Sequence, residues 1–213
     1  MSTFYALILA TAGVAEARCA GTNLFESLSP AQQAEVDARA DAVAYGEGIV
    51  WEVSRNGRRS TLFGTIHISD PTVSIPPVVS QRIAKADQVF LEIVADDEAR
   101  METEMMSNPA LVTLVDGPGL REQLTATEWA RLTELLTPLG LPEVAMDRMR
   151  PWLLSILIAL PMCELLAVQE GGITLDRRVE MLANASGVPV GGLESAAAAL
   201  AAVQPLTEEG ELQ

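Results

Sequence analysis

The only histidine of the chain, His67, is the side chain best suited to chemistry at neutral pH. An imidazole in this pH range can bind a metal ion or move a proton. It closes the run Gly64-Thr65-Ile66-His67 after a β-rich stretch, so we expect it at the carboxyl end of a strand. Gly64 would let another backbone or a ligand come close. Since a lone histidine is more often a hydrogen-bonded structural residue, further polar groups must support a chemical role.

Glu92 is the first such group, because it interrupts the apolar run 88–94. That run is typical of a strand buried on both faces. A carboxylate there needs a cation, a metal ion or a cluster of hydrogen bonds, since desolvating it alone is costly. Two partners remain open, a metal ion and an arginine such as Arg150.

Glu194 repeats the pattern, since it follows a short expected strand, 188–190, and the pair Gly191-Gly192. It could be a metal ligand, or a carboxylate that the positive end of a helix favours. With His67 and Glu92 it would converge on the crevice outside the carboxyl ends of the strands. Three such ligands suit zinc, manganese or iron with one open position for water.

The elements that must position these residues alternate between strands and helices. Residues 49–54 and 59–66 flank Asn56-Gly57, a strong signal for a hairpin. A helical segment, 78–86, then leads to the strand 88–94, which predicts a right-handed crossover with parallel pairing. We therefore expect an α/β fold with a mixed sheet, an N-terminal β-hairpin, helical crossovers and helices covering the sheet.

Capping signals and apolar patterns predict the remaining helices. Ser29 with Gln32, and Thr125 with Glu128, form capping boxes. The expected helices are 30–44, 96–106, 126–136, a helix starting near Leu175, and 195–203. The apolar stretch 151–168 suggests either a transmembrane helix or a central helix sheathed by protein. Pro161 and Glu164 favour the central helix.

Composition limits the classes of partner. The chain has 213 residues, 49% of them hydrophobic, which is enough for one domain with a substantial core. Its 29 acidic and 14 basic residues give a formal net charge of −15, which repels a nucleic-acid backbone. Lys85 is the single lysine, and no basic patch for anionic lipid stands out. We expect neither nucleic acid as a partner nor a transmembrane helix beyond the N-terminal segment.

The N-terminus and the cysteines concern localisation. Residues 1–18 are apolar and end in an Ala-x-Ala arrangement at Ala15 and Ala17, which predicts a signal peptide and an exported protein of the bacterial periplasm. No basic residue precedes Arg18, so a buried first helix is the alternative. Residues 19–213 would then form the domain. Cys19 and Cys163 are either a long-range disulfide or two unrelated thiols.

Six motifs, taken in order, resemble those of the TraB/GumN family, and they span most of the chain from Cys19 to Val203. They are Cys19-Ala-Gly-Thr-Asn-Leu24, Leu62-Phe-Gly-Thr-Ile-His67, Val89-Phe-Leu-Glu92, Arg150-Pro-Trp152, Gly172-Ile-Thr-Leu-Asp176 and Val188-Pro-Val-Gly-Gly-Leu-Glu194. The resemblance implies a fold shared with the TIKI metal-dependent proteases that trim secreted Wnt, and with the pheromone-shutdown proteins TraB and PrgY.

The resemblance also implies roles for individual residues. His67 corresponds to the histidine of the GxxH motif, Glu92 to the strand glutamate and Glu194 to the glutamate of the G-L-E motif, each as a catalytic and metal-ligating residue. Gly64, Arg150 and Asp176 belong to the supporting motifs. A divalent metal (Mn, Co, Zn or Fe) would activate water to attack a peptide carbonyl, with a carboxylate as general base. The implied activity is that of a peptidase-like hydrolase.

One departure leaves a second interpretation open. The family pattern carries a second GxxH motif, whereas this chain has a single histidine. Either the chain ends before that element, as a C-terminally truncated domain, or the activity has been lost. The alternative function is therefore a non-catalytic, extracytoplasmic module of the same fold that binds a peptide or a small-molecule ligand.

Overall fold

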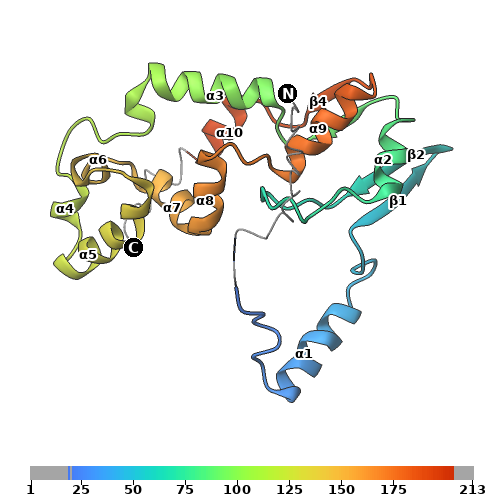
Figure 1. Cartoon of the computed structure of the whole chain (residues 1–213), viewed down its shortest axis with the longest axis horizontal. Coiled ribbons are helices and arrows are strands. Elements are labelled where there is room, and N and C mark those ends of the chain that lie inside the picture. The colour runs from blue at the N-terminus through green and yellow to red at the C-terminus, as the bar shows by residue number, and fades with distance from the viewer. Residues whose placement is uncertain (1–18, 20, 204–213) are drawn as a thin grey trace, which may run out of the picture.

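The computed structural model describes Cys19 and residues 21–203, so the expected signal peptide, residues 1–18, lies outside the described residues. The fold is mixed α/β, as predicted (Figure 1). Its elements are α1 (Pro30–Asp41), β1 (Val50–Arg55), β2 (Arg58–Phe63), α2 (Pro77–Ile83), β3 (Val89–Leu91), α3 (Ala95–Ser107), α4 (Leu120–Gln123), α5 (Ala126–Leu136), α6 (Glu143–Asp147), α7 (Pro151–Ala159), α8 (Met162–Gln169), α9 (Leu175–Ala185), β4 (Val190–Gly192) and α10 (Ala196–Val203).

The predicted hairpin is confirmed. Strands β1 and β2 pair antiparallel, and Asn56 and Gly57 take the positive φ angles, 53° and 77°, that a tight two-residue hairpin turn requires. Strand β2 ends at Phe63, however, and not at His67 as expected. A hydrogen bond from the Gly64 amide to the Ile49 carbonyl, at 2.8 Å, extends the pairing by one step before the chain becomes irregular.

The second sheet differs from the expected crossover. Among the described residues, β3 pairs in parallel with β4 and not with β2, with Val89 opposite Val190. The reason lies in the connection between β2 and α2, residues 64–76, which has no helix or strand. Hydrogen bonds tie this connection to α8 and α9, so it does not lead the chain back beside the hairpin.

Two separate clusters of buried side chains form the core. The first lies where α2, β3 and α9 meet, and Val50 and Phe63 of the hairpin pack against it. The second is built by α4 to α7, at the opposite end of the view in Figure 1. The buried members of the first are Val79, Ile83, Leu91, Val179, Ala183 and Val188, and those of the second are Leu120, Trp129, Leu132, Leu136, Met146 and Leu154.

Both predicted capping boxes are present. The Ser29 side chain accepts from the Gln32 amide at the start of α1, and Thr125 with Glu128 does the same for α5. Helix α1 ends at Asp41, three residues earlier than expected, and has no buried residue. It projects away from the other elements in Figure 1, which is consistent with its polar sequence.

The apolar stretch 151–168 is not one helix. Pro161 cannot continue a helix, and α7 and α8 meet there with their axes bent by 99°. Ile158 is 50% exposed, so the expectation of a helix sheathed on all sides was wrong. Within residues 21–203 no single helix is long and apolar enough to span a bilayer, whereas α7 and α8 together pass that test by length and composition only.

Helix α8 also carries the covalent link of the chain. Cys163 forms a disulfide with Cys19 across 144 residues, with the two Cα atoms 5.4 Å apart. Both cysteines of the sequence are thereby used.

Candidate functional site

His67 lies on the irregular connection between β2 and α2, and neighbouring helices hold this connection in place. The Leu175 amide at the start of α9 donates to the Ile68 carbonyl at 3.0 Å. The Ser69 amide donates to the buried carboxylate of Glu164 on α8. The histidine therefore sits on a fixed segment although it belongs to no strand.

Arg178 of α9 fixes the part of the connection that follows. Its guanidinium donates to the carbonyls of Val73, at 2.6 Å, and Asp70, at 3.2 Å. These bonds cross more than a hundred residues of sequence. The placement of His67 thus depends on tertiary contacts and not on local strand structure.

The imidazole of His67 lies between two carboxylates. Its Nδ1 atom is 2.9 Å from Oδ2 of Asp176, and its Nε2 atom is 3.5 Å from Oε2 of Glu92. The other oxygen of Asp176, Oδ1, accepts from the Thr65 hydroxyl at 2.5 Å. Thr65, Asp176, His67 and Glu92 therefore form one continuous polar chain, drawn from three separate segments of the sequence.

Asp176 is the sheltered member of this chain. It lies in the first turn of α9, where the helix dipole favours a carboxylate, and its side chain is 20% exposed. Its Oδ2 atom is buried and has no hydrogen-bond partner among the described residues. The 2.9 Å contact between this atom and His67 Nδ1 therefore has the distance of a hydrogen bond without its alignment.

Glu92 occupies a different environment from the one expected. Strand β3 ends at Leu91, whose side chain enters the core, and the alternation along the chain then turns Glu92 outward, with 65% of its side chain exposed. The prediction of a carboxylate buried inside a strand was wrong. The alternative ion pair with Arg150 is not found among the described residues either; the Arg150 Nε atom donates to the Ala110 carbonyl at 2.7 Å.

Glu194 approaches the site through its backbone. Its amide donates to the Glu92 carbonyl at 2.8 Å, so the two residues leave neighbouring parallel strands at the same edge. The Glu194 side chain is exposed, and within the described part of the chain no group of three or more His, Cys, Asp or Glu side chains lies close enough to hold a metal ion. The structure thus brings His67, Glu92 and Asp176 together by side chain, and Glu194 by backbone.

No other group approaches Gly64 so closely that a side chain would be excluded there, contrary to the expectation from the sequence. A Cβ atom at this position would lie 3.6 Å from the Trp51 ring, an ordinary contact distance. Its role in the structure is the backbone bond that extends the hairpin toward His67.

The side chains of His67 and Glu92 are the two groups of the site that could hold a cation between them. A neutral imidazole carries one ring proton, so if Nδ1 faces Asp176 with that proton, Nε2 presents a lone pair toward the Glu92 carboxylate. Two ligand atoms about 2.1 Å from a tetrahedral zinc ion lie about 3.4 Å apart. The observed 3.5 Å between Nε2 and Oε2 is close to this separation, and it is also the distance of a direct contact between the two side chains.

Among the residues that support the site, Thr65 and Glu164 were missed by sequence reasoning. Thr65 lies within the GxxH run but was not assigned a role, and Glu164 was noted only as an argument against a membrane span. A buried acid inside an apolar stretch, as at Glu164, is a signal that could have identified it. Its partner, the amide of Ser69, could not have been found in this way.

The turn after His67 gives a prediction about pH. Hydrogen bonds to Asp70 from the Thr72 hydroxyl, at 2.6 Å, and then from the Thr72 amide, at 2.8 Å, lower the pKa of the Asp70 carboxyl below its usual value of 3.8. This contribution to stability is present above 3.8 and is lost as the pH falls through the lowered value. We expect the protection of the Thr72 amide, which is its exchange rate compared with the intrinsic rate at the same pH, to fall under those acidic conditions, as measured by NMR.

Asp70→Ala should make the exchange of the Thr72 amide fast at neutral pH as well. Glu128 provides an internal reference, because Thr125 lowers its pKa in the same way outside this turn. Equal exchange of the Thr72 amide in the wild type and in Asp70→Ala would contradict the assignment.

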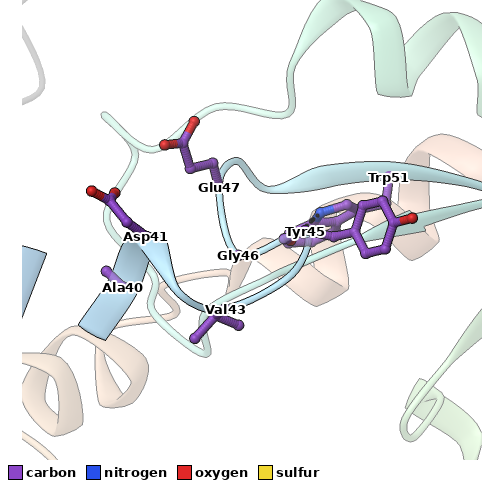
Figure 2. Close-up of a pocket in the computed structure, with 7 residues that line it drawn as sticks. All are labelled: Ala40, Asp41, Val43, Tyr45, Gly46, Glu47 and Trp51. Carbon is purple, nitrogen blue, oxygen red and sulfur yellow. Dashed lines mark hydrogen bonds between the residues drawn. The ribbon is translucent and has the colours of Figure 1, made fainter. Parts of the chain in front are cut away.

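A cavity of about 470 Å³ lies elsewhere, between the end of α1 and the start of β1 (Figure 2). Trp51 and Tyr45 line it, and the Trp51 Nε1 atom donates to the Tyr45 carbonyl at 2.9 Å. Neither His67 nor its carboxylate partners are among the lining residues. The candidate site is therefore an exposed surface cluster that is separate from this cavity.

Comparison with known proteins identifies a family that includes this region of the sequence. The family model described as the TraB/PrgY/gumN family matches residues 49–213, which include His67, Glu92, Asp176 and Glu194. No curated protein and no solved structure matched the chain.

Proposed function

The chain belongs to the TraB/PrgY/gumN family, and from this membership and the geometry of the site we propose that it is a metal-dependent, peptidase-like hydrolase. The observation that carries the proposal is the 3.5 Å spacing of His67 Nε2 and Glu92 Oε2, with Asp176 behind the imidazole. A carboxylate behind a metal-bound histidine is the usual arrangement that fixes its ring.

His67 and Glu92 would hold the metal, and their nitrogen and oxygen ligand atoms suit Mn, Co, Zn or Fe. A metal ion of this kind supplies an activated water and polarises a substrate carbonyl. Asp176 keeps the imidazole turned toward Glu92, while Thr65 holds Asp176. The exposed Glu194 side chain, at the same strand edge, is the proposed third ligand.

The openness of the site supports a peptide or another small ligand as substrate. His67 and Glu92 expose 62% and 65% of their side chains, so an extended substrate peptide lying across the surface could reach both. The disulfide between Cys19 and Cys163 supports the proposal that the protein is exported, because disulfides persist in oxidising compartments such as the periplasm.

Titration calorimetry of the full chain with Mn²⁺, Co²⁺, Zn²⁺ and Fe²⁺ tests the metal site. We expect one ion per chain, and an affinity at least about tenfold lower in Glu92→Gln, because a neutral amide is a poorer ligand than a carboxylate. Glu194→Gln should also weaken binding if Glu194 completes the ligand set.

Glu98→Gln is the matched control. It removes the same charge from an exposed glutamate in the first turn of α3, close in sequence to Glu92. An equal loss of affinity in Glu98→Gln and Glu92→Gln would show that the loss of one negative charge, and not of a metal ligand, causes the effect. No metal-dependent heat with any of the four ions would refute the proposal.

Turnover is tested separately with a library of labelled peptides and the metal-loaded chain. Metal-dependent cleavage that Glu92→Gln abolishes would support the hydrolase. Peptide binding without any product would instead identify the protein as a non-catalytic peptide-binding or small-ligand module.

A further inference from the structure

Two of the three buried polar side chains of the described residues belong to the connection that carries His67 and to the helix that holds it. Among the described residues, the polar or charged side chains in the core are Ser69, Glu164 and Glu180, with exposures of 6%, 5% and 8%. Ser69 and Glu164 contact each other, through the Ser69 amide and the Glu164 carboxylate. Burying a carboxylate is unfavourable unless specific hydrogen bonds compensate it, and the bond from the Ser69 amide supplies such compensation to Glu164.

The contact acts on one peptide group. The Ile68 carbonyl and the Ser69 amide belong to the same peptide bond, which is the second peptide bond after His67. The carbonyl accepts from the Leu175 amide of α9, and the amide donates to Glu164 of α8. Because both polar ends of this peptide plane are held, it cannot flip without breaking two hydrogen bonds to two different helices.

The surroundings leave little room for another arrangement. A Cβ atom at Gly172 would lie 2.7 Å from the Ser69 Oγ atom and 2.7 Å from the Ala167 carbonyl oxygen. The missing side chain at Gly172 thus lets the Ser69 turn pack closely against the end of α8. Glu164 itself lies in the first turn of α8, next to Cys163, so the disulfide anchors the same turn.

We propose that Glu164 is a positioning residue for His67. By holding the peptide plane between Ile68 and Ser69, its carboxylate sets the backbone from which the imidazole reaches between Asp176 and Glu92. The inference rests on the proposed function only for its effect on metal affinity, since the placement of the ring can be measured without metal.

Because the chain has one histidine, the ring nitrogens of His67 give two unambiguous ¹⁵N resonances. In the wild type, the hydrogen bond to Glu164 should shift the Ser69 amide proton downfield. In Glu164→Ala we expect this shift to be lost, and the two ring resonances to move toward the averaged position of an unrestrained imidazole. In Glu164→Gln, the side-chain carbonyl can still accept from the Ser69 amide. This variant should therefore restore both signals close to their wild-type positions.

Asp147→Ala is the matched control. The Asp147 carboxylate also accepts from a distant backbone amide, that of Arg121 at 2.8 Å, but it does so beside the second core cluster. Its loss should lower stability while leaving the His67 ring resonances unchanged. A role of Glu164 in stability alone would make the two alanine variants alike in this measurement.

Unchanged Ser69 and His67 resonances in Glu164→Ala would overturn the proposal. If Glu164→Ala does not fold, Glu164→Asp provides the test, because it keeps the charge but withdraws the carboxylate by one methylene. Unchanged Ser69 and His67 resonances in Glu164→Asp would overturn the proposal equally. In calorimetry, Glu164→Ala should bind metal about 10- to 100-fold more weakly. If the resonances change in Glu164→Ala while the wild-type chain binds no metal, the positioning role is upheld and the proposed function is refuted.

Discussion

His67→Ala is expected to lower metal affinity by more than about a hundredfold, the largest effect of any single substitution at the site. Loss of a residue that merely orients a ligand already costs about 10- to 100-fold, and His67 supplies the proposed ligand atom itself. No other histidine in the chain can replace it. Calorimetry with Zn²⁺ and Mn²⁺, together with peptide cleavage by the metal-loaded chain, measures the effect.

Asp176→Asn provides the graded comparison for His67→Ala. The amide keeps the size of the side chain but removes the charge that faces Nδ1 at 2.9 Å. A loss of about 10- to 100-fold is therefore expected, smaller than that of His67→Ala. Wild-type affinity in His67→Ala would exclude the imidazole from the metal site, whatever the result for Asp176→Asn.

Cys163→Ser is expected to lower the free energy of unfolding by about 5 kcal/mol, as estimated from the chain entropy released across a loop of this length. The bond closes 144 residues, which include most of the described structure. The segment it tethers has little else to hold it, since α1 buries no residue. Urea denaturation of the oxidised wild type and of the variant measures the difference.

Cys19→Ser and the double variant provide the controls for Cys163→Ser. Both remove the same cross-link, so their midpoints of denaturation should agree with that of Cys163→Ser. Equal midpoints in the wild type and in all three variants would show that the bond contributes nothing to stability. A loss in Cys163→Ser alone would point to the packing of that side chain and not to the cross-link.

Local features of the fold could be predicted from the sequence because a few adjacent residues determine them. The turn at Asn56-Gly57 requires positive φ angles, which these residues accept more readily than others. Ser29 with Gln32 satisfies the first amides of α1 within a single turn. Such signals need no knowledge of the rest of the chain.

The pairing of strands and the environment of Glu92 could not be predicted in the same way. Apolar neighbours suggested a strand buried on both faces, but burial depends on which elements cover each face, and β3 ends one residue before Glu92. The partner of β3 is β4, about a hundred residues away in sequence. Likewise, the contact of Glu164 with Ser69 spans 95 residues and leaves no local pattern.

The division of the buried side chains into two clusters has a spectroscopic consequence. Trp129 lies in the cluster built by α4 to α7, and Trp152 lies on α7 and donates to the Leu111 carbonyl, so two of the three tryptophans report on that end of the protein. Intrinsic fluorescence will therefore follow mainly the loss of that cluster. Near His67 only Trp51 contributes, since its ring lies within contact distance of Gly64, so the unfolding of that region gives a smaller share of the change in emission.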